Sequence, residues 1–129
     1  MTRAVGIDSL TALLKRIPAI QKRRIGSGDL EGGGWWVKFG VDTSHALAWH
    51  TIQEMGHVLN YVLINERLPT VFMPVSPPPY MNGGPGEFLS WVIECRDPKF
   101  TPQNAAEWLS GRLPEPVDDE AAWRHSYDV

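Results

Sequence analysis

WWVKFGVD, residues 35–42, shows the clearest structural pattern in this chain, because apolar side chains alternate with polar or small ones. Successive side chains of a β-strand point to opposite faces, so the alternation predicts a half-buried strand. Its two faces comprise Trp35, Val37, Phe39 and Val41 on the apolar side, and Trp36, Lys38, Gly40 and Asp42 on the other.

A helix is predicted directly after this strand. Asp42-Thr43-Ser44 contains residue types that favour a helix N-cap. Gly56 weakens the helix midway, and the β-branched residues of Val58–Ile64 would also fit a strand. We expect the helix to continue to residue 64. Its apolar side consists of Leu47, Ile52, Met55, Val58, Leu59 and Val62.

Two further strands are predicted at Thr70–Val75 and Phe88–Cys95. Pro74 lacks a backbone donor, so the first of them should be an edge strand or end there. Alternation in the second strand places Cys95 on its apolar face. This position predicts a core-filling side chain and not a reactive thiol.

The segment SPPPYMNGGPGE, residues 76–87, connects these two strands. Its three consecutive prolines favour a stiff polyproline II ridge, and its glycines allow the chain to turn back. Hairpin loops usually have about 2–5 residues, so a loop of 12 residues is typical of a functional Ω-type loop. We predict that this loop binds a partner protein. The binding residues predicted in it are Pro78, Pro79, Tyr80, Met81 and Asn82.

The N-terminal part is predicted to be a helix followed by a linker. Asp8 or Ser9 can cap a helix that Pro18 ends, and Lys22–Gly34 is a basic cluster followed by a glycine-rich stretch. Residues 35–129 are expected to form one α+β domain with an acidic C-terminal tail. Its last clear helix begins at Thr101-Pro102.

The predicted order is α-β-α-β-β-α, which favours a small, largely antiparallel sheet of three or four strands covered by helices. The only cysteine, Cys95, excludes an intrachain disulfide and a multi-cysteine zinc site. No apolar run is long enough to cross a membrane, and no secretory signal is recognised. We therefore expect a cytoplasmic protein without a membrane partner.

Charge is unevenly distributed over a chain of net charge −3. Residues 1–34 carry six bases and three acids, which gives +3, whereas residues 113–129 carry five acids and one base, which gives −4. The two ends are expected to attract each other or partners of opposite charge. Trp36 on the polar face of its strand, and Asp118, Asp119 and Glu120 in the tail, are secondary candidates for binding.

A metal site is the alternative. His50, Glu54 and His57, spaced by four and three residues, share one face of the predicted helix. The spacing differs from that of zinc proteases, and the E-x-x-H pair matches only one part of a diiron site, which needs further helices. This face can equally be a solvated polar surface.

Catalytic and nucleic-acid motifs are weak. The sequence contains neither a G-x-S-x-G elbow nor a phosphate-binding loop. The basic stretch KRIPAIQKRR beside Trp35 and Trp36 could contact single-stranded nucleic acid, but the acidic net charge disfavours it. The sequence favours a protein–protein interaction module without a cofactor, such as an inhibitor, an immunity-type partner of a toxin or an adaptor, over a metal-dependent enzyme. The sequence is also compatible with a homo-oligomer.

Overall fold

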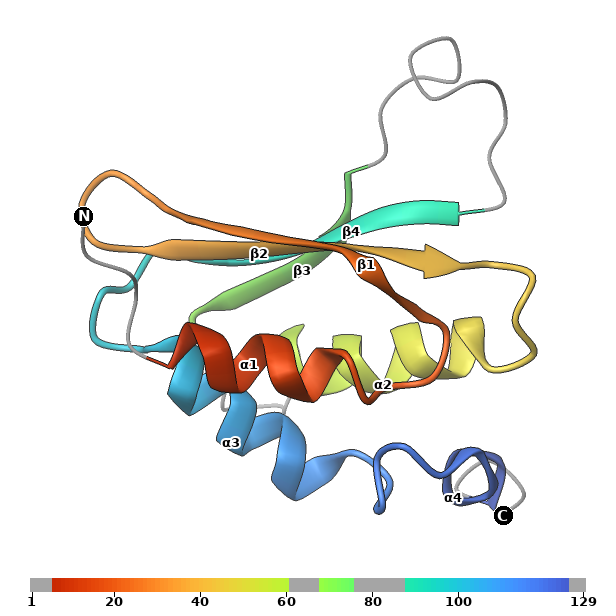
Figure 1. Ribbon diagram of the computed structural model, residues 1–129. Helices are drawn as coiled ribbons and strands as arrows, with labels where there is room; N and C mark the ends of the chain where they lie inside the picture. Colours follow the sequence, from red (N-terminus) through yellow and green to blue (C-terminus); the bar gives the residue numbers. More distant parts are fainter. Residues whose placement is uncertain (1–5, 61–67, 76–87, 126–129) are drawn as a thin grey trace, which may run out of the picture.

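The computed structural model describes residues 6–60, 68–75 and 88–125. Within these ranges, four helices and four strands follow one another (Figure 1). They are α1 (Ile7–Leu14), β1 (Ile20–Asp29), β2 (Trp35–Asp42), α2 (Ala48–Asn60), β3 (Thr70–Pro74), β4 (Phe88–Cys95), α3 (Pro102–Arg112) and α4 (Glu120–His125).

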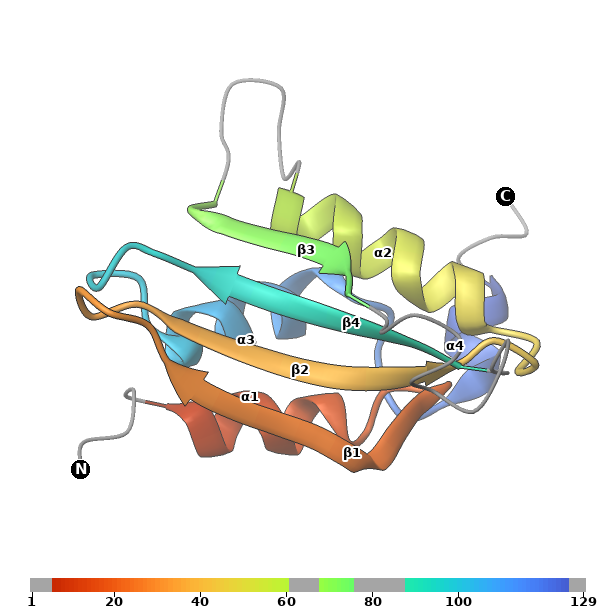
Figure 2. The same ribbon diagram turned by 90° about the horizontal axis from the view of Figure 1, so that it is seen from above.

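The strands form one antiparallel sheet in the order β1-β2-β4-β3. Helices α1, α2 and α3 lie under one face of this sheet, whereas the opposite face, seen from above in Figure 2, carries none of the described helices. The prediction of a small antiparallel α+β fold is confirmed. None of the helices in the described ranges combines the length and apolarity needed to cross a membrane.

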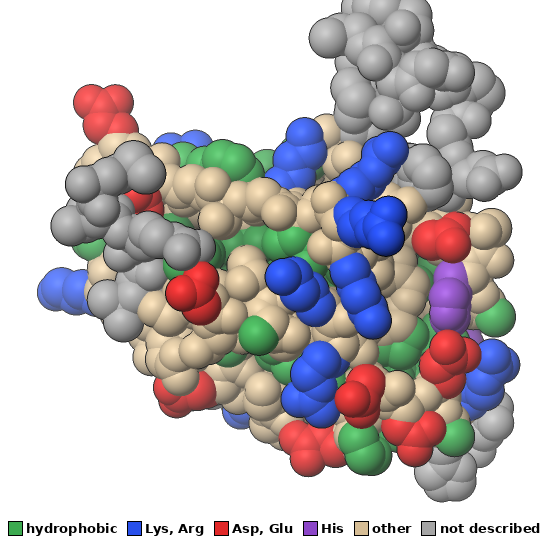
Figure 3. Space-filling model, viewed as in Figure 1, with side chains coloured by type: hydrophobic (Ala, Val, Ile, Leu, Met, Phe, Trp, Pro, Cys, Tyr) green, Lys and Arg blue, Asp and Glu red, His purple; other side chains and the backbone are tan. Residues whose placement is uncertain are grey.

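Strand β1 corrects the prediction of a linker at Lys22–Gly34. It pairs with β2 from Ile20 to Asp29, with an irregularity between Gln21 and Gly26, so the boundary expected at residue 34 lies within one sheet. The core receives Ile20, and Ile25 packs against it, while most of the strand is exposed. Figure 3 shows Lys and Arg side chains gathered on this side of the molecule. These mostly polar residues form a strand because the backbone of β2 supplies hydrogen-bond partners for their N–H and C=O groups.

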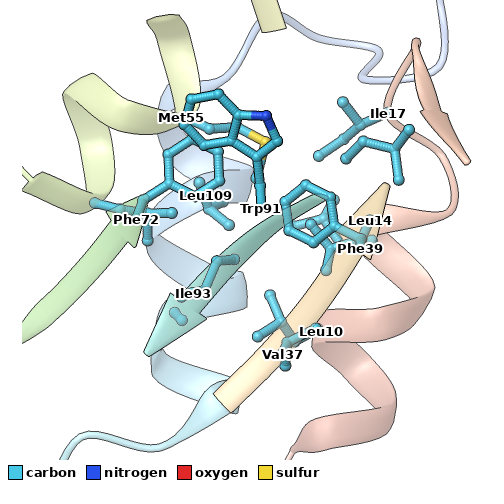
Figure 4. Packing of buried hydrophobic residues seen from close by; sticks show 14 of the residues in the cluster. Leu10, Leu14, Ile17, Val37, Phe39, Met55, Phe72, Trp91, Ile93 and Leu109 are labelled. Carbon is cyan, nitrogen blue, oxygen red and sulfur yellow. The ribbon is translucent and has the colours of Figure 1, made fainter. Parts of the chain in front are cut away.

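The core lies between the sheet and the helices (Figure 4). Val37 and Phe39 of β2 point into it, as the alternation predicted, and both are almost completely buried. Phe72 of β3 stacks on Trp91 of β4 with ring centroids 4.9 Å apart. Helices contribute Leu10, Leu14, Met55 and Leu109 to the same cluster. Apolar burial on one face of the sheet is thus the main stabilising contribution.

Two helices begin differently from the prediction. The N-cap of α1 is Gly6, in the left-handed conformation, and not Asp8 or Ser9. Helix α2 begins only at Ala48, because Asp42 Oδ1 accepts hydrogen bonds from the backbone nitrogen and the hydroxyl of Ser44 in a local turn. The Ser44 hydroxyl, with its backbone N–H, lowers the pKa of Asp42. Residues 61–64, expected to continue α2, lie outside the described residues.

The C-terminal part agrees more closely with its prediction. Thr101 caps α3 in a capping box with Asn104, as expected for a helix that begins at Thr101-Pro102, and the helix ends at Arg112. Trp123 of α4 is fully buried, and its Nε1 donates a hydrogen bond to the Val117 carbonyl over 2.8 Å. The acidic tail is therefore docked on the domain through α4.

Cys95 is expected to react only when the protein unfolds. Its side chain is fully buried in the core, and burial raises the pKa of its thiol. Since the thiolate is the reactive species, we expect its modification by a disulfide reagent to be at least about 100-fold slower in buffer than in denaturant. Absorbance of the released thiolate measures both rates. Similar rates in the two solutions would contradict the buried position.

Candidate functional site

The predicted binding loop, residues 76–87, lies outside the part of the chain that the structure describes. Pro78, Pro79, Tyr80, Met81 and Asn82 all lie outside the described residues. The structure does show how the strands on both sides of the loop are held. Pro74 at the end of β3 pairs with Trp91, and the Val75 nitrogen donates a 2.7 Å hydrogen bond to the Ser90 carbonyl. The role of the loop stays a prediction.

The sheet face opposite the described helices carries a short apolar strip, which consists of Val71 and Met73 of β3 and Val92 of β4. Met73 lies opposite Val92 in the antiparallel register, and Val71 opposite Glu94. Val71 and Met73 are 48% and 37% exposed, whereas Val92 is 7% exposed. Lys38, which pairs with Val92 from the other side, adds a charge next to the strip.

Trp36 lies on the same sheet face, as predicted, and is half-buried. It pairs with Gly28 of β1, and a Cβ placed on Gly28 would lie 2.6 Å from the Trp36 ring. The indole therefore lies across this glycine and covers the sheet. Its neighbour Trp35 is 1% exposed, so it offers no surface for stacking on a nucleic-acid base.

The free edge of β3 is occupied by a side chain of α2. Asn60 Nδ2 donates to the Phe72 carbonyl over 3.1 Å, and the Phe72 nitrogen donates to Asn60 Oδ1 over 2.9 Å. The Thr70 hydroxyl donates to the Leu59 carbonyl over 2.7 Å. The amide of Asn60 thus makes the hydrogen bonds that a neighbouring strand would make.

Charged residues form two neighbouring patches. The basic patch comprises Lys15, Arg16, Lys22, Arg23 and Arg24, at the end of α1 and along β1. The acidic patch comprises Asp118, Asp119 and Glu120, all exposed. Figure 3 shows basic side chains with acidic ones below them towards α4.

The two patches meet at an ion pair, in which Arg16 Nε lies 3.6 Å from Asp118 Oδ2. This pair brings one base of residues 1–34 next to one acid of residues 113–129. Glu120 also lies 3.6 Å from His45 Nε2, and Asp119 accepts a hydrogen bond from the Ala121 nitrogen at the start of α4. Because the Arg16 and Asp118 side chains are more than half exposed, the pair contributes little stability.

A pocket of about 430 Å³ lies between α1, the end of α3 and the following turn. Three of its lining residues, Leu13, Leu113 and Val117, are at least 93% buried. The others are Arg16, Ser110, Glu115 and Pro116. Sequence reasoning missed this pocket because its residues come from segments almost 100 positions apart, and no local pattern marks them.

The metal alternative gains no geometric support. His50, Glu54 and His57 lie on α2, where His57 is exposed and the other two are partly buried. Within the described ranges, no group of three His, Cys, Asp or Glu side chains converges in a way that could hold a metal ion. The predicted set therefore shares a helix but forms no ligand cluster.

Comparisons with known proteins give no assignment, because no family model, no curated protein and no solved structure matches the chain.

Proposed function

We propose that this chain is a protein-binding module, of the kind found in inhibitors, immunity-type proteins and adaptors. The observation that carries the proposal is the apolar strip of Val71, Met73 and Val92 on a sheet face that no described helix covers. Exposed apolar side chains grouped on one face are typical of interaction surfaces.

The surroundings of the strip support a protein partner. Lys38 and Glu94 adjoin it on the same face, and Glu94 lies 3.0 Å from Arg96. An apolar centre with a charged rim is the usual composition of a protein interface. The strip also lies on the two strands that residues 76–87 connect, so the predicted loop and the strip can belong to one surface.

The edge of β3 favours docking on the face of the sheet. A partner that extended the sheet would have to pair with the Phe72 backbone, which already bonds to Asn60. A partner that lies across Val71 and Met73 leaves these hydrogen bonds intact. The proposed contact is therefore made by side chains and not by strand addition.

Met73→Asp is expected to weaken the proposed complex by at least about tenfold, because it places a charge in an apolar contact. Ser27→Asp introduces the same charge at an exposed position of β1 and should leave the affinity unchanged. Proteins captured by the full chain are purified, and the affinity of each variant is measured by calorimetry. Tyr80→Ala tests the predicted loop in the same assay.

Equal affinity of Met73→Asp and Ser27→Asp for every captured protein would contradict the proposed surface. Capture of no protein at all would contradict the proposed function. If the bound protein is a second copy of this chain, the module is a homo-oligomer, and the adaptor and inhibitor roles are withdrawn.

A further inference from the structure

A row of one aromatic and two cationic side chains follows β2 on the sheet face opposite the described helices. Trp36 and Lys38 lie on this face two residues apart, so they are separated by about 7 Å along the strand. Gly40 is the next position on the face, and an added Cβ there would lie 3.4 Å from Cδ of Arg24. The side chain of Arg24 therefore continues the row from β1.

The indole of Trp36 and the sheet surface beside Lys38 are both open to a ligand. The nitrogen-bearing edge of the indole lies over Gly28, and the side chain is only half-buried, so part of the ring stays accessible. Gly26 pairs with Lys38, and a Cβ placed on Gly26 meets no atom within 4 Å. A glycine in a strand often marks a place where another chain approaches the backbone closely.

Further cations lie next to the row on β1. Lys22 and Arg23 belong to the irregular stretch between Gln21 and Gly26, where the pairing with β2 shifts. Both are exposed, as is Lys38, and within the described ranges none of these three cations forms an ion pair. Figure 3 shows the basic side chains gathered on this side of the molecule. Their charges are therefore available to an external anion.

The acids that border the row are already engaged or face away. Glu94 lies opposite Trp36 on β4 and 3.0 Å from Arg96, and Asp42 at the end of β2 accepts hydrogen bonds from Ser44. Asp29 pairs with the core residue Trp35 and so belongs to the other face. The acidic residues 113–129 include α4, which lies on the helix side of the sheet (Figure 1). The negative net charge thus does not describe this face.

We propose that this row binds single-stranded nucleic acid. A base stacks on Trp36, Lys38 and Arg24 contact the phosphates of the following nucleotides, and the cations of β1 extend the track. A line of cations combined with an aromatic stacking platform is the usual way in which single strands are bound without sequence preference. The inference goes beyond the proposed protein contact, because it uses β1 and β2, whereas the apolar strip lies on β3 and β4.

Two other polyanions fit the row less well. A nucleic-acid duplex keeps its bases stacked inside the helix, so Trp36 would find no base to contact. An acidic protein segment would neutralise the cations, but its carboxylates make no use of the accessible indole. The aromatic position at one end of the cationic row therefore favours a single strand.

A labelled oligonucleotide of about 12 thymidines, within the usual site size, tests the proposal by fluorescence anisotropy with the full chain at low ionic strength. Trp36→Leu keeps an apolar cover over Gly28 but has no aromatic ring, so it should lower the affinity about tenfold. Trp49→Leu is the matched control, because this indole is 52% exposed on α2, and it should leave the affinity unchanged. Circular dichroism checks that both variants are folded.

The salt dependence provides a second comparison. The logarithm of the affinity should fall with the logarithm of the salt concentration, with a slope of about −0.7 for each phosphate contact. Lys38→Ala should therefore make this slope shallower by about 0.7. Arg124→Ala removes an exposed cation of α4 and should leave the slope unchanged.

Four results would overturn the inference. The first is no binding at low ionic strength, and the second is equal affinity of Trp36→Leu and Trp49→Leu. The third is equally tight binding of a duplex of the same length, which would exclude base stacking. The fourth is displacement of the oligonucleotide by polyglutamate of equal charge at equal concentration, which would assign the cations to an acidic protein. Met73→Ala should bind the oligonucleotide normally, so a failure of the proposed protein surface is distinguishable from a failure of this row.

Discussion

Trp35→Ala is expected to lower the free energy of unfolding by about 3–5 kcal/mol. Trp35 is 1% exposed, its Nε1 donates a 2.8 Å hydrogen bond to the Phe100 carbonyl, and its strand lies in the middle of the sheet. The substitution removes a large core side chain and leaves the Phe100 carbonyl with only the weaker Cys95 thiol as a donor, over 3.6 Å. Urea denaturation followed by circular dichroism measures the loss.

Two control variants separate the loss of apolar volume from the loss of the hydrogen bond and test the effect of burial. Trp35→Phe keeps most of the apolar volume but has no donor, so it should cost about 1–3 kcal/mol. Trp49→Ala removes an indole that is 52% exposed and should change stability by no more than about 0.5 kcal/mol. If Trp35→Ala costs no more than Trp49→Ala, the central position of β2 in the core is wrong.

Gly6→Ala is expected to lower the free energy of unfolding by about 3–5 kcal/mol, from a strained backbone and a steric overlap together. Gly6 has a φ of 83° at the start of α1. An added Cβ would lie 2.5 Å from the backbone nitrogen of Gln103 and 2.6 Å from its Cα. Because these are backbone atoms of α3, the two helices would have to move apart. Urea denaturation measures the loss.

Gly32→Ala measures the cost of the strained backbone alone, without a steric overlap. Gly32 has a φ of 92°, but a Cβ there meets no atom within 4 Å. We expect it to cost about 1–2 kcal/mol, which is less than Gly6→Ala. Equal losses in the two variants would mean that the close approach of α1 and α3 adds no cost.

The sequence was most informative where one strand has two chemically different faces. β2 and β4 each alternate, and the structure places Val37, Phe39, Trp91 and Ile93 in the core. β1 was missed because its residues around Lys22 have no such alternation, and its conformation depends on a distant partner strand. The prediction that Asp42-Thr43-Ser44 caps a helix was wrong, because the Asp42 side chain stabilises a local turn with Ser44 instead.

The candidate sites were less predictable, since they depend on neighbours across the fold. Charge counts left open whether the ends attract each other or separate partners, and Arg16 and Asp118 are one pair in which they meet. The sequence could not indicate that Trp36 lies across Gly28, because that contact depends on the register of two strands. The pocket of Leu13 and Leu113 has no sequence signal at all, since it exists only where α1 meets the end of α3.

The side-chain amide of Asn60 bonds to the backbone of the edge strand β3 and so prevents another strand from pairing there. By saturating the Phe72 backbone, it removes the template on which another molecule could polymerise beside β3. At the opposite margin, the cationic residues of β1 would repel an identical strand laid against them. The protein can therefore present apolar Val71 and Met73 to solvent with little risk of growing sideways into fibrils.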